Sequence, residues 1–393
     1  MYAGERQPRR TGDDNSVMNP AQATMISGEE FKMCHVPSVA FDADGMMYVS
    51  YYRDSTTTVE KISNPNTHTV LARLDPSTPG SVTTFRHLGV GDSVGDFTQE
   101  EKAPYDPTLL ALGDRIVYTF QSFEKGERGY AASFFNIKEG RFENHMERCT
   151  LTYTDSNGRK VTVPFTDSGR IRCYKEAFGY KEPKHLGLCV LHSRYICHNG
   201  EYYSALSCDG PLNFGPLMVK TVDGVNFEVL FEMPEFNMGT CEVGQELFKG
   251  EFYIIARTAQ SFKDKKRRGL YIAKYSLDGE CICAPRRISS EPTRPALLVH
   301  RNRLYAFFNT TPLVPNDAAK RGVMRRSRMR VAIVTPDCHF SRYSDVTSPY
   351  SIQYYALGVN KGKVYVAFTE DRRQLNPNIS KGNISVSAIK LFR

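Results

Sequence analysis

Residues 241–258, CEVGQELFKGEFYIIART, set the pattern for the whole chain. An apolar stretch leads to Lys249–Gly250, and a second stretch rich in Phe, Tyr and Ile follows. Two such runs joined by a short glycine-containing turn predict an antiparallel β-hairpin. Glu242 opens the first run and Arg257 closes the second, so the hairpin brings a carboxylate and a guanidinium to one end. The two side chains form either a surface ion pair or half of a site for an anionic sugar.

The same hairpin pattern occurs five more times. The other units cover residues 35–54, 105–123, 186–207, 294–310 and 351–371. The spacing leaves room for two further strands per unit, and helical periodicity is nearly absent. Self-similarity of this kind is typical of a radial array of sheets. We therefore predict an all-β, six-bladed β-propeller with four antiparallel strands per blade. Five or seven blades also fit the pattern, because outer strands are hard to count.

The sequence divides into a short N-terminal segment and one long domain. Residues 1–30 contain few apolar side chains and no periodicity, so we expect a flexible or draped N-terminal arm. We expect residues 31–393 to form one propeller domain, because all-β propellers run long as single domains.

Composition excludes several classes of function. The net charge of +8 over 393 residues favours anionic ligands and gives no nucleic-acid-binding footprint. No stretch approaches the roughly 20 apolar residues that span a bilayer, so we expect no membrane association. The N-terminus has no apolar leader, so we expect a cytoplasmic protein, or a secreted one if a signal has been removed. The ten cysteines lack zinc-ligand spacing. We expect no metal and no cofactor, and free thiols in a reducing compartment.

Three turns share a pattern where the third and fourth strands of a blade should meet. Residues 221–227, 276–279 and 335–340 each carry a hydroxyl residue followed two residues later by Asp. Such a turn hydrogen-bonds to itself and forms a hairpin tip. These turns resemble degenerate Asp boxes, the S-x-D-x-G-x-x-W turns (BNR repeats) of sialidase-type propellers, although the chain contains no Trp. Over roughly residues 33–372 the chain resembles the sialidase superfamily.

Two hairpins carry most of this resemblance. Sialidases have a Glu at the start of a fourth-blade strand and an Arg that closes the same hairpin; here Glu242 and Arg257 stand fifteen residues apart. The family's nucleophile is a sixth-blade Tyr in a Y-S-x-L context, followed by a glycine-containing turn and an acidic residue. Tyr354, in Tyr-Tyr-Ala-Leu, matches this position, and Glu370 and Asp371 are the acidic residues that follow.

The arginines of the family match less completely. The third family arginine follows a fifth-blade F-x-N-x-P stretch, here residues 308–312. Arg328 is our first choice for this arginine and Arg321 is our second. The first-blade F-R-I-P motif is replaced by Cys-His-Val-Pro, so His35 stands where the family has its first arginine.

The resemblance also implies an acid/base Asp on the loop after the first hairpin. Arg53, Asp54 and Glu60 are the residues available there, and we choose Asp54 as the acid/base and Arg53 as a substrate-binding residue. Asp106 opens blade two and Arg294 opens blade five in the way that His35 opens blade one, and both could contact substrate.

The start of every inner strand faces one end of the propeller channel. The topology therefore predicts that five side chains converge there: His35, Asp106, Glu242, Arg294 and Tyr354. A keto-acid sugar carries a carboxylate at its anomeric carbon, which repels an anionic nucleophile but not a Tyr hydroxyl whose proton a Glu accepts. Arginines bind such a carboxylate through paired hydrogen bonds. The resemblance thus implies a retaining hydrolase that removes a terminal acidic sugar from a carbohydrate or glycoconjugate.

Other functions fit the same residues. A furanosidase-like hydrolase could use Asp106 and Glu242 as paired carboxylates. A polysaccharide lyase could use His35 or His192 with Tyr354 to abstract a proton. A non-catalytic propeller could bind carbohydrate or protein on the same face, and the fold alone does not choose among these functions. Neither the sugar nor the oligomeric state follows from the sequence.

Overall fold

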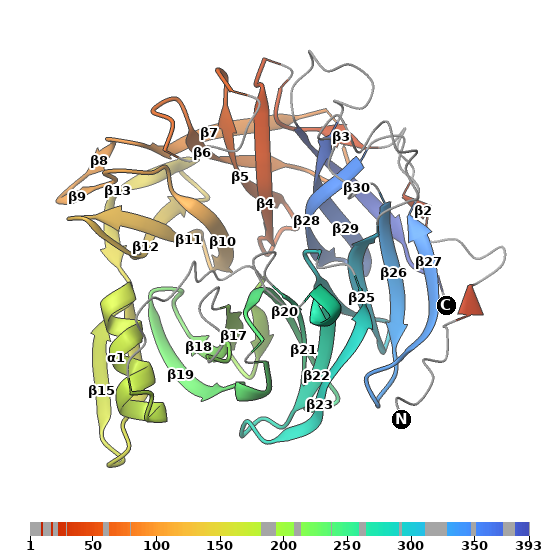
Figure 1. Cartoon of the computed structure of the whole chain (residues 1–393). Coiled ribbons are helices and arrows are strands. Elements are labelled where there is room, and N and C mark those ends of the chain that lie inside the picture. Colours follow the sequence, from red (N-terminus) through yellow and green to blue (C-terminus); the bar gives the residue numbers. More distant parts are fainter. Residues whose placement is uncertain are drawn as a thin grey trace.

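Hairpins of β-branched and aromatic residues repeat around a central axis and build six blades (Figure 1). The computed structural model describes residues 9–10, 17–18, 23–28, 30–57, 63–78, 80–181, 194–207, 214–236, 238–258, 265–290, 293–310, 328–346, 351–371 and 382–392. Within these ranges, six sheets of four or more strands confirm the predicted six-bladed, antiparallel β-propeller. The described helices are all too short or too polar to cross a lipid bilayer.

Each blade is built outward from an inner hairpin. Blade one contains β4 (Met33–Phe41), β5 (Met47–Asp54), β6 (His68–Leu74) and β7 (Val82–Gly89). Blade two contains β10 (Tyr105–Leu112), β11 (Arg115–Glu124), β12 (Glu127–Asn136) and β13 (Arg141–Arg148). Blade three contains β16 (Ile196–His198), β17 (Glu201–Leu206), β18 (Leu217–Thr221) and β19 (Asn226–Glu232). A two-stranded ribbon of β8 (Ser93–Val94) and β9 (Phe97–Thr98) lies between blades one and two in the sequence.

The second half of the ring repeats this plan. Blade four contains β20 (Thr240–Phe248), β21 (Glu251–Thr258), β22 (Leu270–Tyr275) and β23 (Cys281–Ser289). Blade five contains β24 (Ala296–His300), β25 (Arg303–Thr310), β26 (Arg328–Val334) and β27 (Phe340–Val346). Blade six contains β28 (Ser351–Asn360), β29 (Lys363–Asp371) and β30 (Asn383–Lys390). Two short 3-10 helices, Pro234–Phe236 and Lys265–Arg267, lie in the connections.

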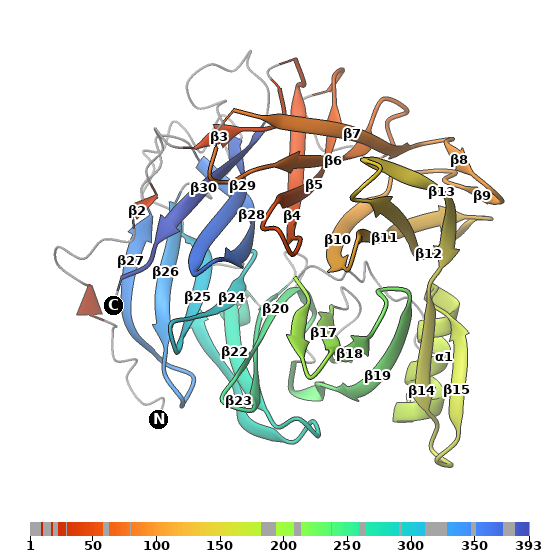
Figure 2. The same cartoon turned by 180° about the vertical axis from the view of Figure 1, so that it is seen from behind.

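Blade three carries an insertion that the sequence pattern does not predict. A hairpin of β14 (Thr150–Thr154) and β15 (Lys160–Pro164) extends the blade, because β14 pairs in parallel with β19. The helix α1 (Asp167–Phe178) follows it and lies beside this hairpin in both views (Figures 1 and 2). Thr166 caps the first turn of α1 by accepting a hydrogen bond from Gly169 N, and Gly179 ends the helix in the left-handed conformation.

The N-terminal arm closes the ring. Its strand β1 (Arg9–Arg10) pairs with β27 of blade five. Two further strands, β2 (Val17–Met18) and β3 (Thr24–Met25), pair with β30 and so supply the outer edge of blade six. The first and last parts of the chain therefore complete the same sheet.

The hydrophobic core is divided among the contacts between neighbouring blades. Buried apolar clusters lie between blades one and two, two and three, three and four, four and five, five and six, and six and one. No blade can bury both of its faces alone, so the ring must close to remove this surface from water.

Candidate functional site

Four inner strands bulge near their first residues. The pairing register shifts between His35 and Ser38 in β4, Tyr105 and Thr108 in β10, Thr240 and Glu242 in β20, and Ile352 and Tyr355 in β28. Within two of these bulges, Val36 and Asp106 have φ angles of 51° and 43°. A bulge turns a side chain away from its regular direction and is common beside active sites. The bulges thus reorient residues of four blades at the start of their inner strands.

Glu242 and Arg257 face each other across the hairpin that opens blade four. They are register partners, and Arg257 Nε donates a hydrogen bond to Glu242 Oε2. The pair is buried, with 3% of Glu242 and 6% of Arg257 exposed, so it is not a surface ion pair. Arg257 Nη2 also contacts Cys241 Sγ at 3.3 Å. Arg257 Nη1 is buried without an acceptor among the described residues.

The charge state of Arg257 follows from these contacts. Burial alone would lower the pKa of the guanidinium, but the charge of Glu242, with smaller contributions from Cys241 and Tyr354, raises this pKa above its ordinary value. Arg257 is therefore a permanent cation that lies close enough to Tyr354 for the two groups to interact electrostatically.

Two cationic or ionisable side chains from other blades contact the Tyr354 ring. The His35 ring meets the Tyr354 ring edge-on, with centroids 4.4 Å apart and an interplanar angle of 80°. On another side, the Arg294 guanidinium carbon lies 5.2 Å from the centroid of the Tyr354 ring, in cation–π range. Blades one, four, five and six therefore meet around this phenol.

An aromatic wall extends the site toward blade two. The Tyr52 ring lies 5.8 Å from the His35 ring and 6.0 Å from the Tyr105 ring. His35 Nδ1 lies 3.4 Å from Thr369 Oγ1 on β29. Asp106 follows Tyr105 directly and is only 4% exposed. Glu370, next to Thr369, is also only 4% exposed.

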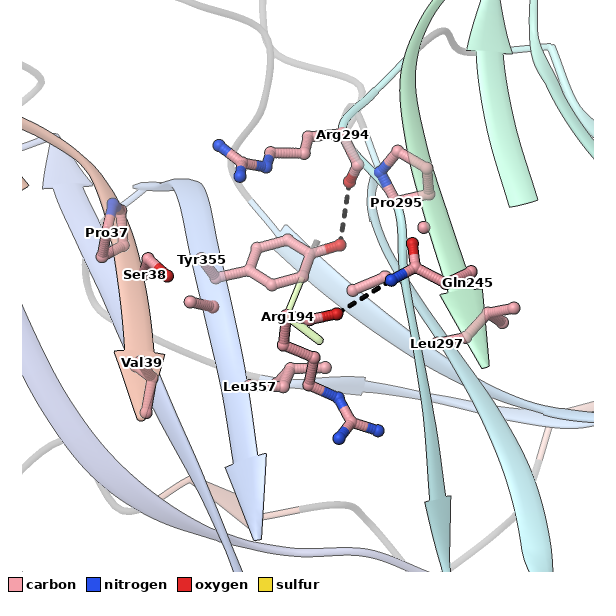
Figure 3. Close-up of a pocket in the computed structure, with 13 residues that line it drawn as sticks. Pro37, Ser38, Val39, Arg194, Gln245, Arg294, Pro295, Leu297, Tyr355 and Leu357 are labelled. Carbon is pink, nitrogen blue, oxygen red and sulfur yellow. Dashed lines mark hydrogen bonds between the residues drawn. The ribbon is translucent and has the colours of Figure 1, made fainter. Parts of the chain in front are cut away.

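A small cavity lies in the axial channel behind this site (Figure 3). A cavity of about 30 Å³, room for no more than one or two waters, lies between the inner strands of blades one, four, five and six. Tyr355 faces this channel and donates a hydrogen bond to the Arg294 carbonyl at 2.9 Å. Arg194 pairs with Glu246, and its carbonyl accepts a hydrogen bond from Gln245 at 2.8 Å.

The hydrogen bonds that Tyr355 and Asn309 donate to the backbone were not predicted from the sequence. Tyr355 fixes the backbone that presents Arg294, and Asn309 Nδ2 donates to the Ile352 carbonyl at 2.6 Å, beside the bulge of β28. Asn309 follows the apolar run Tyr305–Phe308 directly, and an amide side chain at the end of such a run is the signal that could have identified it.

Asp54 and Arg53 have different surroundings. Asp54 is buried at the end of β5 and accepts hydrogen bonds from Thr56 N at 2.6 Å, Thr56 Oγ1 at 2.8 Å, Thr57 N at 3.0 Å and Thr67 Oγ1 at 2.7 Å. Burial raises the pKa of the Asp54 carboxyl, but these hydrogen bonds outweigh burial and lower it below its ordinary value. Arg53 donates a hydrogen bond to His68 Nε2 at 3.0 Å, and its guanidinium lies 4.0 Å from the Phe31 ring centroid.

Several predicted residues fall partly or wholly outside the described part of the chain. Arg321, Glu60 and His192 lie outside the described residues. Arg328 begins β26 opposite Thr310, and Asp371 ends β29 opposite Ser351, and for both only the backbone is described. Among the described residues, no group of three or more His, Cys, Asp or Glu is arranged to hold a metal ion.

Comparison with solved structures finds the same architecture. The Trypanosoma rangeli sialidase in complex with the inhibitor DANA superposes with a TM-score of 0.57 at 11% identity, over 96% of this chain and 58% of that one. The intramolecular trans-sialidase from Ruminococcus gnavus, in complex with oseltamivir carboxylate, superposes with a TM-score of 0.57 at 11% identity, over 97% and 99%. This chain has the sialidase fold. The resemblance predicted from the sequence is confirmed at the level of the fold.

The chain also resembles a solved structure of unknown function. A Dyadobacter fermentans protein of unknown function has a TM-score of 0.60 at 13% identity, over 96% of this chain and 99% of that one. The chain spans only 58% of the Trypanosoma rangeli enzyme. No protein-family model and no curated protein matches the chain.

Proposed function

We propose that this sialidase-fold chain is a retaining glycoside hydrolase that removes a terminal keto-acid sugar, with Tyr354 as the nucleophile. The observation that carries the proposal is the set of contacts around Tyr354: His35 at its edge, Arg294 over its ring, and Arg257 in electrostatic range. Arg257 is in turn bonded to Glu242. A phenol surrounded by guanidinium groups suits a substrate whose reacting carbon bears a carboxylate.

Each residue has a distinct role in this mechanism. Tyr354 attacks the anomeric carbon as a neutral phenol, which avoids repulsion by the substrate carboxylate. Glu242 accepts the phenolic proton as the covalent bond forms. Arg257 and Arg294 bind the carboxylate through charge-assisted hydrogen bonds, and the paired geometry of a guanidinium fits that group.

The proton for the leaving group comes from a second carboxyl group. Asp54 is our sequence-based choice, but its lowered pKa keeps it ionised at neutral pH, whereas a general acid must hold its proton. Asp106, buried in the bulge that opens blade two, is the alternative donor. Asp54→Asn and Asp106→Asn separate these two assignments. Loss of the true general acid slows the hydrolysis of glycosides with poor leaving groups far more than the hydrolysis of nitrophenyl glycosides.

The proposal is tested with aryl glycosides of sialic acid and related keto-acid sugars. We expect turnover by the full chain, and a loss of about 10²–10⁴-fold in kcat for Glu242→Gln, the usual worth of a general base. Tyr354→Phe should reduce turnover to background. Tyr365→Phe is the matched control, because it removes a phenol from blade six at the far end of the β28–β29 hairpin. Turnover by Tyr354→Phe at the rate of the unaltered chain would refute the mechanism.

A non-catalytic carbohydrate-binding propeller is the second candidate. Four hydrogen bonds hold the Asp54 carboxylate in a turn. They favour this second function, because Asp54 then serves to stabilise the turn and not to protonate a leaving group. In that case calorimetry would detect binding of acidic sugars that weakens in Arg294→Met, with no hydrolysis of any glycoside.

A further inference from the structure

Three equivalent turns reveal an unusual cysteine on the outer part of the ring. The turns at residues 221–224, 276–279 and 335–338 each join the third and fourth strands of a blade, in blades three, four and five. Their last residues are Gly224, Gly279 and Cys338, with φ angles of 75°, 86° and 59°. A left-handed φ suits glycine and is strained for a residue with a side chain. Blade five therefore carries a side chain where the other two blades carry none.

The direction of that side chain follows from the repeat. A Cβ built on Gly224 would lie 2.9 Å from Val117 Cγ1 of blade two, and one built on Gly279 would lie 2.5 Å from the Phe231 ring of blade three. Each turn thus points its last residue at the preceding blade. The same rule directs Cys338 toward blade four.

The residue that Cys338 meets in blade four is another cysteine. Cys283 of β23 packs against the apolar cluster between blades four and five that contains Cys338. Cys283 Sγ lies 3.9 Å from the carbonyl oxygen of Asp337, the residue bonded to Cys338. Cys338 is fully buried, while Cys283 is partly exposed, and both are free thiols.

We propose that Cys283 and Cys338 form a reversible redox site that links blades four and five by a disulfide when a small disulfide oxidant is present. The Cys283 thiolate attacks one sulfur of oxidised glutathione, forms a mixed disulfide and releases one glutathione thiolate. Cys338 then loses its proton, attacks Cys283 Sγ and displaces the second glutathione. Two protein thiols are oxidised, and one glutathione disulfide is reduced to two glutathiones.

The environments of the two thiols set this order. Burial, together with the neighbouring Cys283, raises the pKa of the Cys338 thiol, which makes it a poor first nucleophile. Cys283 is the thiol that solvent reaches, so the oxidant meets it first. Once the mixed disulfide has formed, Cys338 is already adjacent to the sulfur that it must attack. The bond joins the blade that holds Glu242 to the blade that Arg294 opens.

The test equilibrates the native full chain in glutathione buffers of increasing oxidised fraction. Free thiols are then alkylated in acid, and the peptides are mapped by mass spectrometry. We expect one cross-linked peptide pair containing Cys283 and Cys338, which rises with oxidised glutathione and disappears with dithiothreitol. The urea midpoint of the oxidised chain should rise, because a cross-link restricts the unfolded state.

Two variants check the order of the steps. Cys338→Gly restores the residue of the other two turns, so it should fold, and it should accumulate a glutathione adduct on Cys283 that cannot resolve. Cys283→Ser should leave Cys338 unmodified in the native state. Absence of the cross-link at every buffer ratio, pairing of Cys338 with Cys281 instead, or glutathionylation of Cys338 in Cys283→Ser would each overturn the proposal.

Discussion

The buried Glu242–Arg257 pair gives the sharpest test of whether blade four is built for stability or for function. With 3% and 6% of these residues exposed, both charges are removed from water and stabilise each other. Removing one partner leaves the other charge buried and uncompensated, which costs about 3–5 kcal/mol. We therefore expect Glu242→Leu and Arg257→Met each to lose about that much free energy of unfolding.

The double variant has a different outcome. Replacing a buried ion pair by apolar residues of similar volume is often neutral or stabilising by about 1–4 kcal/mol, because neither charge then pays for desolvation. We expect Glu242→Leu/Arg257→Met to be at least as stable as the unaltered chain and to lose turnover. Urea unfolding is followed by far-UV circular dichroism, because the chain contains no Trp for fluorescence. If the loss in the double variant equals the sum of the two single losses, the two charges do not stabilise each other and our reasoning is wrong.

Three further predictions concern single residues. Burial lowers the pKa of His87 to about 3. Below about pH 6.5 the unfolded chain therefore binds a proton that the folded chain does not bind. The free energy of unfolding should be constant above about pH 6.5 and should fall by about 2 kcal/mol by pH 5. A flat urea midpoint over this range would contradict that. Arg294→Met should raise KM for an acidic glycoside by about 10–100-fold, the worth of a hydrogen bond to a charged group, and an unchanged KM would exclude Arg294 from the carboxylate site. Gly279→Ala should destabilise the chain more than Gly362→Ala, because both have positive φ but only the first new Cβ meets a neighbour, Phe231 at 2.5 Å. Equal losses of unfolding free energy would show that the positive φ alone, and not the contact with Phe231, determines the cost of the substitution.

Most of the fold could be predicted because its signal is local and repeated. Each inner hairpin shows apolar strands and a polar turn within one short window, so six units can be recognised independently. The helix α1 could not be recognised in this way. Its buried positions include Gly169 and Arg170, so no apolar stripe marks its inner face. The strands β1, β2 and β3 have two residues each, too few for any periodicity.

One contact of the candidate site was predictable from the sequence, but the detailed geometry around it was not. The pairing of Glu242 with Arg257 follows from hairpin register, which the turn at residues 249–250 fixes. No residue pattern predicts the bulges, although they reorient Asp106 and the corresponding residues at the start of β4, β20 and β28. The surroundings of Asp54 depend on Thr67, which comes from the neighbouring strand region and is thirteen residues away. Such a partner is set by tertiary packing and leaves no mark in the sequence around Asp54.

The pairing of β30 with β2 and β3 has a consequence for how the chain is made in the cell. A ribosome synthesises residues 17–25 long before residues 383–390, yet these segments belong to one sheet. Until blade six has been synthesised, the face of blade one that packs against it has no partner. The nascent ring therefore exposes this surface until β30 has been synthesised, so we expect removal of residues 383–390 to be more damaging than the small number of lost residues suggests.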